Sequence, residues 1–204
     1  MRTAAAASTI LQGARAATQA LAIEPGREPP TAVDALVAGV LAIAAQHPAV
    51  LLGSITILLG GTGEGLLAID GRARQPGVGA PRPRGFQSPT EVPPEARIAT
   101  PGLPAGLALS HAGRGTRTLD ELARIALDSA AQSGPLDEDL ASSIRTFGRE
   151  GATLLRGGAL REALLAASAR SRGGLLTGAD LDQMRPIVTE AEAVLRGRLP
   201  KLLR

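Results

Sequence analysis

The chain has 204 residues, enough for one ordinary domain or two small ones, and 44% of them are hydrophobic, so a substantial core can be buried. The formal net charge is only +3, and two Phe with no Tyr or Trp argue against a surface that stacks nucleic-acid bases on aromatic rings. The absence of Cys excludes a disulfide framework, a thiolate zinc site and a cysteine nucleophile.

The N-terminal segment is rich in small residues. Gln12 and Arg15 interrupt it before the apolar core of a signal peptide can form. We therefore expect an amphipathic helix over 3–22 and a cytoplasmic protein.

A Pro-rich break at 24–31 precedes the first strongly apolar helix. Thr31 is a suitable N-cap, and Asp34 lies in the first turn, where the helix dipole favours an anion. The pattern predicts a helix over 32–46 that ends before Pro48.

The apolar run at 35–59 is divided at Pro48 into pieces too short for a bilayer, so we expect no membrane partner. Residues 49–59 are continuously apolar and β-branched, which predicts a strand covered on both faces. Residues 65–71 are predicted to return as the second strand of a hairpin.

The Gly-rich segment at 60–63 is typical of a hairpin turn. A phosphate-binding loop is the alternative, but such a loop is followed by a helix, whereas strands flank this segment on both sides. Glu64 would also repel a phosphate.

The rest of the chain divides into a Pro/Gly-rich loop at 72–96 and a helical part at 97–204, so that with 1–71 we expect a single domain. Thr118–Glu121 has the pattern of a capping box. Caps, breakers and apolar spacing predict helices that start near Pro104, over 118–131, from Leu136 through Phe147, over 159–172, from Thr177 to Pro186, and from Thr189 to about Arg198.

Only two strands are evident in the sequence. Two strands do not form a stable independent sheet. Because this pair is so apolar, other elements must also cover it. Either the pair lies entirely under helices, or another polypeptide supplies further strands.

No pattern of catalytic or metal-binding residues is present. The chain has no GxSxG or Walker A motif, and its two His lie outside any metal-ligand spacing. We expect a structural role for His47 and a solvated His111 after its helix, with no metal and no cofactor.

The remaining site candidates are Arg72, Arg74, Arg82 and Arg84, which follow the second predicted strand. A guanidinium matches a carboxylate through two parallel hydrogen bonds. The alternative is a solvated basic loop.

Four blocks, in order, resemble γ-glutamyltranspeptidases. They are PPTAVDALVAGVLAIAAQHP, SITILLGGTGEGLLAIDGR, RIATPGLPAGLALSHAGRGTRTLDELARIALDSA and SARSRGGLLTGADLDQMRPIV, and together they span 29–188. Asp-Gly-Arg after a hairpin, Pro-Gly before a helix and Gly-Gly-Leu-Leu-Thr before Asp-Leu carry most of the specificity.

The resemblance implies the large, N-terminal subunit of a self-processing N-terminal nucleophile hydrolase. Such an enzyme has a four-layer αββα sandwich, of which this helix-rich α+β chain would form one half, with its sheets completed by a partner chain. The partner would be a small subunit whose N-terminal Thr is the nucleophile, so no catalytic residue is expected here. The resemblance also implies a zymogen that becomes a heterodimer and needs no cofactor.

In this family one Arg of the large subunit binds the α-carboxylate of the γ-glutamyl group. The match of DGRARQP places it at Arg72, with Arg74 as the alternative on the same face if the register differs by two residues. The expected substrate is a small amide that carries a carboxylate. A different class of function remains open, namely a non-catalytic scaffold whose amphipathic helices bind partners.

Overall fold

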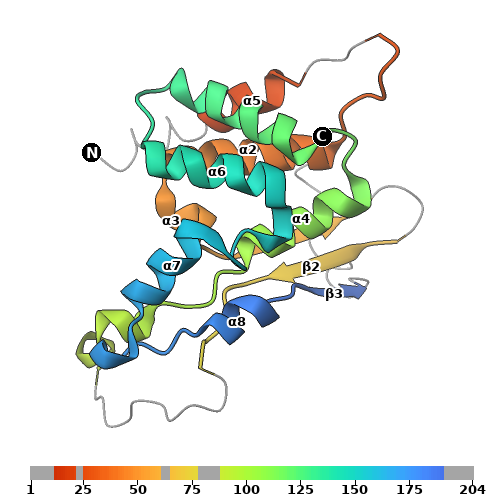
Figure 1. Cartoon of the computed structure of the whole chain (residues 1–204). Coiled ribbons are helices and arrows are strands. Elements are labelled where there is room, and N and C mark those ends of the chain that lie inside the picture. The colour runs from red at the N-terminus through yellow and green to blue at the C-terminus, as the bar shows by residue number, and fades with distance from the viewer. Residues whose placement is uncertain (1–11, 22–24, 61–64, 78–87, 191–204) are drawn as a thin grey trace.

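Helices cover one face of a small antiparallel sheet (Figure 1). The computed structural model describes residues 12–21, 25–60, 65–77 and 88–190. Within the predicted N-terminal helix, residues 12–19 are helical, and the rest of that prediction lies outside the described residues or in turns. No helix in the described ranges is long and apolar enough to cross a bilayer.

Helix α2 (Ala32–Gln46) begins as the sequence predicts. Thr31 caps it, and Thr31 and Asp34 form a complete capping box. Asp34 is fully buried and also accepts hydrogen bonds from Thr116 and Arg117, which lie in the turn before the helix α5 (Leu119–Ala131). One carboxylate therefore joins two segments that are far apart in the sequence.

The strand predicted over 49–59 is wrong in its first half. Pro48 begins a short helix, α3 (Pro48–Leu51), because its fixed φ suits the first helical turn. The strand β1 covers only Ile55–Leu59. Continuous apolar residues fit a buried helix as well as a buried strand, so periodicity does not separate the two.

The antiparallel pairing of the predicted hairpin is confirmed, and a third strand extends it, while residues 61–64 of its predicted turn lie outside the described residues. β1 pairs antiparallel with β2 (Leu67–Gly71), and β2 pairs antiparallel with β3 (Ile187–Glu190). The helix predicted from Thr189 is therefore wrong at 189–190, where the chain is extended, and its remainder lies outside the described residues. The sequence predicts two strands, whereas the described residues form three.

The helical part follows the predicted caps and breakers closely. The elements are α4 (Leu103–Arg114), α5 (Leu119–Ala131), α6 (Glu138–Glu150), α7 (Gly158–Ala167) and α8 (Gly178–Gln183). The helix predicted over 159–172 ends early at Ala167, and the short 3-10 helix η4 (Arg170–Arg172) follows. The Thr118 side chain caps α5, but Glu121 does not complete the box because it pairs with Arg27.

Part of the predicted Pro/Gly-rich loop is also ordered into 3-10 turns, η1 (Pro89–Glu91) and η2 (Pro94–Arg97). Residues 78–87 of that loop lie outside the described ranges.

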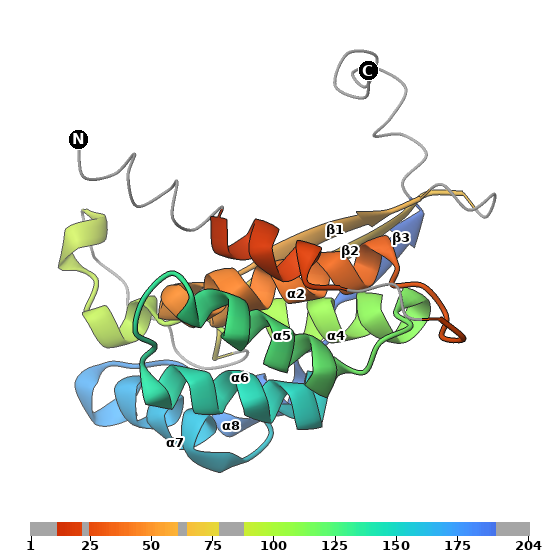
Figure 2. The ribbon, with the colours of Figure 1, turned by 90° about the horizontal axis from the view of Figure 1, so that it is seen from above.

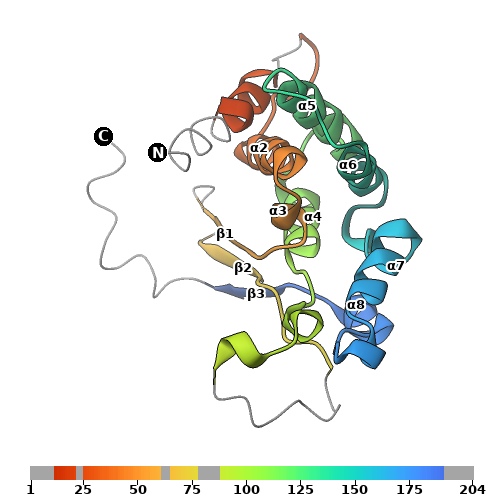
Figure 3. The same cartoon turned by 90° about the vertical axis from the view of Figure 1, so that its left-hand side faces the viewer.

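The core lies between the helices and beneath one face of the sheet. Leu41, Leu107, Leu122, Ile144 and Phe147 are completely buried. Figure 2 shows the sheet along one side of the helices, with α6 and α7 on the side far from β1. Figure 3, which looks along the layers, shows α2 and α4 on the same side of the sheet.

The opposite face of the sheet is not covered by any described element. Ile57 and Ile69 point to the helices and are buried, so the residues that alternate with them face outward. Leu58 and Ile187 lie on this outer face, and each is 49% exposed. The predicted strand cover on both faces is therefore absent within the described part of the chain.

Candidate functional site: the Arg72 end of β2

Three glycines bring the end of β2 against the start of α4. A Cβ on Gly71 would lie 2.9 Å from the Gly102 carbonyl oxygen and 3.1 Å from the Gly106 Cα. A Cβ on Gly102 would overlap the Gly71 carbonyl oxygen. Because no side chain fits in this contact, the backbone that carries Arg72 rests directly on the helix terminus.

The backbone after Arg72 is held on two sides. The Ala73 N–H donates to the Ser54 Oγ at 2.8 Å. Arg74 and Thr100 exchange backbone hydrogen bonds of 3.0 and 2.8 Å and form an isolated antiparallel bridge. The backbone of the segment with both predicted arginines is therefore held by hydrogen bonds at Ala73 and Arg74, although the strand β2 itself ends at Gly71.

Asp180 fixes the segment further along. Its two carboxylate oxygens each lie 3.1 Å from the Gly77 N–H. Asp180 also forms a complete capping box with Thr177 at the start of α8. The sequence motif that predicted a helix start therefore also holds the loop that follows Arg74.

Arg72 forms a bidentate ion pair with Asp70. The Arg72 Nε lies 2.9 Å from Asp70 Oδ1, and Nη2 lies 2.7 Å from Oδ2. The Arg72 backbone N–H also donates to Oδ1, at 3.0 Å. These hydrogen bonds, with the charge of Arg72, lower the pKa of Asp70 to about 2, while Asp70 raises the pKa of Arg72.

The pair lies at the outer face of the sheet. Asp70 is opposite Thr56 of β1 and Ile187 of β3, on the side away from the helices. The Arg72 side chain is 73% exposed, and its remaining N–H groups make no hydrogen bond to a described residue. This arrangement can bind a carboxylate at the uncovered face.

The other predicted arginines are less defined. Arg74 is exposed, and its side chain has no hydrogen-bond or ion-pair partner among the described residues. Arg82 and Arg84 lie outside the described residues. The structure therefore describes Arg72 and Arg74, both exposed, and does not place the other two.

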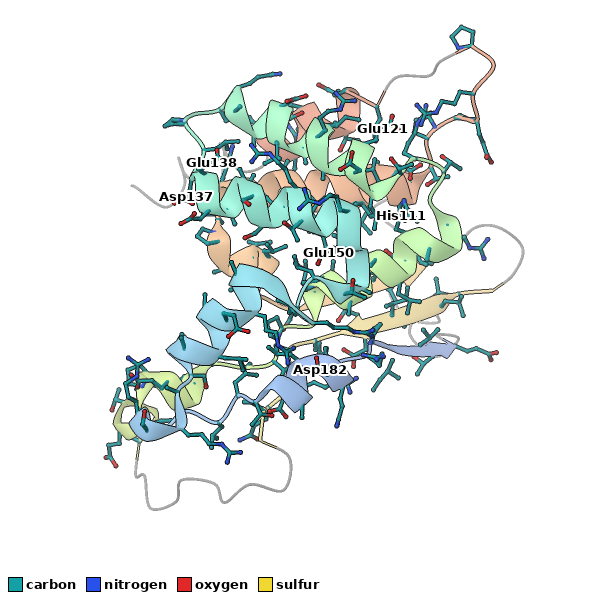
Figure 4. The ribbon with its side chains drawn as sticks, viewed as in Figure 1. His111, Glu121, Asp137, Glu138, Glu150 and Asp182 are labelled. Atoms are coloured by element: carbon teal, nitrogen blue, oxygen red, sulfur yellow. The ribbon has the colours of Figure 1, made fainter. Side chains whose placement is uncertain are left out.

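No described group of His, Asp and Glu residues could hold a metal ion. Figure 4 shows the labelled acidic residues on several different helices. Glu121, Glu138 and Asp182 pair with arginines. The prediction that His111 follows its helix in solvent is wrong, because His111 lies within α4, is half-buried, and has Nε2 at 2.6 Å from the Arg117 carbonyl oxygen.

Asp70 and Asp180 are the residues that sequence reasoning did not assign to the site. Asp70 had a local signal, because an Asp two residues before a backbone N–H commonly accepts from it. The contact of Asp180 with Gly77 spans 103 positions and has no local signal.

No protein-family model matches the chain, and no curated protein matches it. Solved structures do. A γ-glutamyltranspeptidase from Pseudomonas nitroreducens in complex with L-DON is 20% identical, with a TM-score of 0.68 over 88% of this chain and 64% of that chain. The Helicobacter pylori γ-glutamyltranspeptidase is 21% identical, with a TM-score of 0.66 over 86% of this chain and 62% of that one.

A cephalosporin acylase from Bacillus halodurans is 19% identical, with a TM-score of 0.59 over 79% of this chain and 39% of the acylase chain. This chain thus spans less than two thirds of the two transpeptidase chains. The resemblance to γ-glutamyltranspeptidases that the sequence blocks indicate is confirmed at the level of the fold.

Proposed function

We propose that the chain is the large subunit of a self-processing amidohydrolase or γ-glutamyl transferase, with its Thr nucleophile on a small subunit. The proposal is supported by the fold shared with two transpeptidases and an acylase. The sequence blocks that resemble the family contain α2, the β1–β2 hairpin, α4, α8 and nearly all of α5 of this structure.

The main structural support for the proposal is the uncovered face of the sheet. Among the described large hydrophobic residues that are exposed, Leu58 and Ile187 lie on this outer face, Val188 lies opposite Ile69 on the helix-facing side, and Leu109 belongs to a helix. Large apolar side chains exposed on a sheet face favour a covering layer. A second sheet from the small subunit would complete a four-layer αββα sandwich.

The helical scaffold alternative has less support. A scaffold that binds partners through its helices needs an apolar helix face open to them. The described helices turn their apolar faces into the core, and Leu109 is isolated.

The proposed reaction proceeds through an acyl-enzyme. The Thr hydroxyl attacks the γ-amide carbonyl while its own α-amine accepts the hydroxyl proton. The C–N bond then breaks, and the amine leaves with a proton. Water or an acceptor amine attacks the ester and releases the acyl group, which regenerates the Thr hydroxyl.

Arg72 has the binding role in this proposal. Its guanidinium would hold the α-carboxylate of the substrate, so that the γ-amide reaches the nucleophile. Arg74 is the alternative ligand. The location at the uncovered face supports Arg72, because a partner sheet seated there would enclose the bound carboxylate.

Kinetics of the enzyme with its small subunit test the proposal. We expect turnover of a γ-glutamyl anilide by the complex and none by residues 1–204 alone. Arg72→Ala should raise KM by about tenfold or more with a smaller change in kcat, because a charge-assisted bidentate pair is lost. Arg72→Lys should restore binding only in part, since an ammonium cannot form the two parallel bonds.

Arg74→Ala is the matched control, with an exposed cation removed two residues away. An unchanged KM in Arg72→Ala together with a raised KM in Arg74→Ala would move the ligand role to Arg74. Turnover by residues 1–204 alone would contradict the two-chain enzyme.

A further inference from the structure

The Asp70–Arg72 pair uses only one edge of the guanidinium. Asp70 accepts from Nε and Nη2, which form the side edge of the group. A guanidinium has five N–H donors in a planar fork. The end edge, formed by Nη1 and the second hydrogen of Nη2, still presents two parallel donors, which is the arrangement that a second carboxylate needs.

We propose that Asp70 is the positioning residue of the carboxylate site, because it holds Arg72 by the side edge and presents the end edge to the ligand. The inference rests on the proposed role of Arg72 as the carboxylate ligand. It adds a residue that determines how well the site is organised before the ligand arrives.

Asp70 is suited to this role by its place in the sheet. It lies in the central strand β2, with paired neighbours in β1 and β3, so its backbone is fixed on both sides. The Arg72 side chain is 73% exposed and has no other described hydrogen-bond partner. Without Asp70 the long side chain would sample several rotamers, and binding would have to immobilise it.

The Asp70 charge also acts against a bound carboxylate. The two carboxylates would lie on different edges of the guanidinium, with the cation between them. At an exposed site, water and salt screen the interaction of two such charges strongly. The ordering of Arg72 should therefore outweigh the repulsion, so that removal of Asp70 weakens binding.

Modification of arginine by a dicarbonyl reagent tests the inference at single residues. The protein is purified with any chain that accompanies it, treated with phenylglyoxal at increasing L-glutamate concentrations, and digested. Mass spectrometry then gives the modification rates of Arg72 and Arg74 separately. Wild type is compared with Asp70→Asn, which keeps one acceptor oxygen, and with Asp70→Ala, which keeps none.

In wild type we expect Arg72 to react more slowly than Arg74, since Asp70 holds its Nη2, and we expect glutamate to protect it. Asp70→Ala should raise the glutamate concentration for half-protection about two- to tenfold, the cost of immobilising one flexible side chain. In Asp70→Asn the glutamate concentration for half-protection should lie between the values for wild type and Asp70→Ala. The Arg74 rate should change less than the Arg72 rate, because Asp70 acts on Arg74 only through its charge, and this difference separates positioning from a general loss of structure.

Equal protection of Arg72 in wild type and Asp70→Ala, or tighter protection in the variant, would overturn the positioning role and leave the function of Arg72 intact. Absence of protection in wild type would be a different failure, because it would remove the proposed carboxylate site itself.

Discussion

Asp34 illustrates how much one buried side chain contributes to this fold. It is 0% exposed and accepts from the Thr31 N–H at 2.7 Å and the Thr116 hydroxyl at 2.8 Å. The Arg117 N–H donates to its other oxygen at 3.2 Å. The carboxylate thus satisfies donors at the start of α2 and in the turn before α5.

Asp34→Asn should reduce the free energy of unfolding by roughly 2–3 kcal/mol, because the amide NH₂ would face backbone donors that need an acceptor. Urea unfolding at neutral pH measures the loss. Asp128→Asn is the control, since Asp128 is 68% exposed in a long i,i+4 pair, and it should change stability by less than about 0.5 kcal/mol. Equal losses in the two variants would contradict the role of Asp34.

The same residue predicts a pH dependence. Burial raises the pKa of Asp34, but hydrogen bonds from Thr31, Thr116 and Arg117 outweigh it and lower the pKa below its ordinary 3.8. Stability from Asp34 is therefore complete above pH 3.8 and is lost as the pH falls through the lower folded-state pKa. The stability difference between wild type and Asp34→Asn should narrow in acid, and a constant difference would contradict this assignment.

At the scale of elements, the contact of β2 with α4 positions the candidate site. Gly102→Ala would bring a Cβ to 2.6 Å from the Arg72 carbonyl oxygen and into the Gly71 carbonyl. Since Gly102 has φ −110°, alanine suits the backbone there and the cost is steric. We expect a loss of about 1–3 kcal/mol in thermal unfolding and a raised KM, because the Arg72 backbone must move.

Gly113→Ala is the matched control in the same helix. A Cβ at Gly113 meets nothing within 4 Å, so alanine should leave KM unchanged and stabilise α4 by up to about 1 kcal/mol. If both variants lost the same stability, the close contact of β2 with α4 would not be the cause of the loss in Gly102→Ala.

The sequence predicts elements that have local signals. Thr31 with Asp34 and Thr177 with Asp180 mark helix starts that the structure confirms. β3 was missed because Ile187–Glu190 is four residues long and is a strand only through its pairing with β2, more than 100 positions away. Strand pairing of this kind depends on tertiary contacts rather than on local preference.

Only part of the candidate site has a local signal in the sequence. Arg72 stands out in the sequence because Asp-Gly-Arg follows a hairpin. The contacts that fix the backbone after Arg72, from Ser54, Thr100 and Asp180, come from three other segments. None of them has a signal in the residues around Arg72.

At the scale of the whole molecule, the open sheet face predicts self-association. Residues 1–204 alone should form oligomers or aggregates, because Leu58 and Ile187 expose an apolar face and β1 has no neighbour on its outer edge among the described strands. Leu58→Thr with Ile187→Thr should shift the chain toward monomer, as threonine keeps the preference for strands. Size exclusion with light scattering measures the change.

Leu109→Gln is the control, since it removes an exposed apolar side chain from α4 rather than from the sheet. It should not change the oligomeric state. A monodisperse, cooperatively melting monomer of the unsubstituted chain would contradict the need for a covering layer.

In the proposed enzyme, this chain binds the substrate and a second chain carries the nucleophile. Intact-mass spectrometry tests it directly, on protein from cells that express the whole gene region, after reaction with a diazoketone analogue of glutamine. We expect two chains, with one adduct on the N-terminal Thr of the smaller chain and none on the chain that contains Arg72. An adduct on residues 1–204, or a protein that turns over γ-glutamyl amides without a second chain, would contradict it.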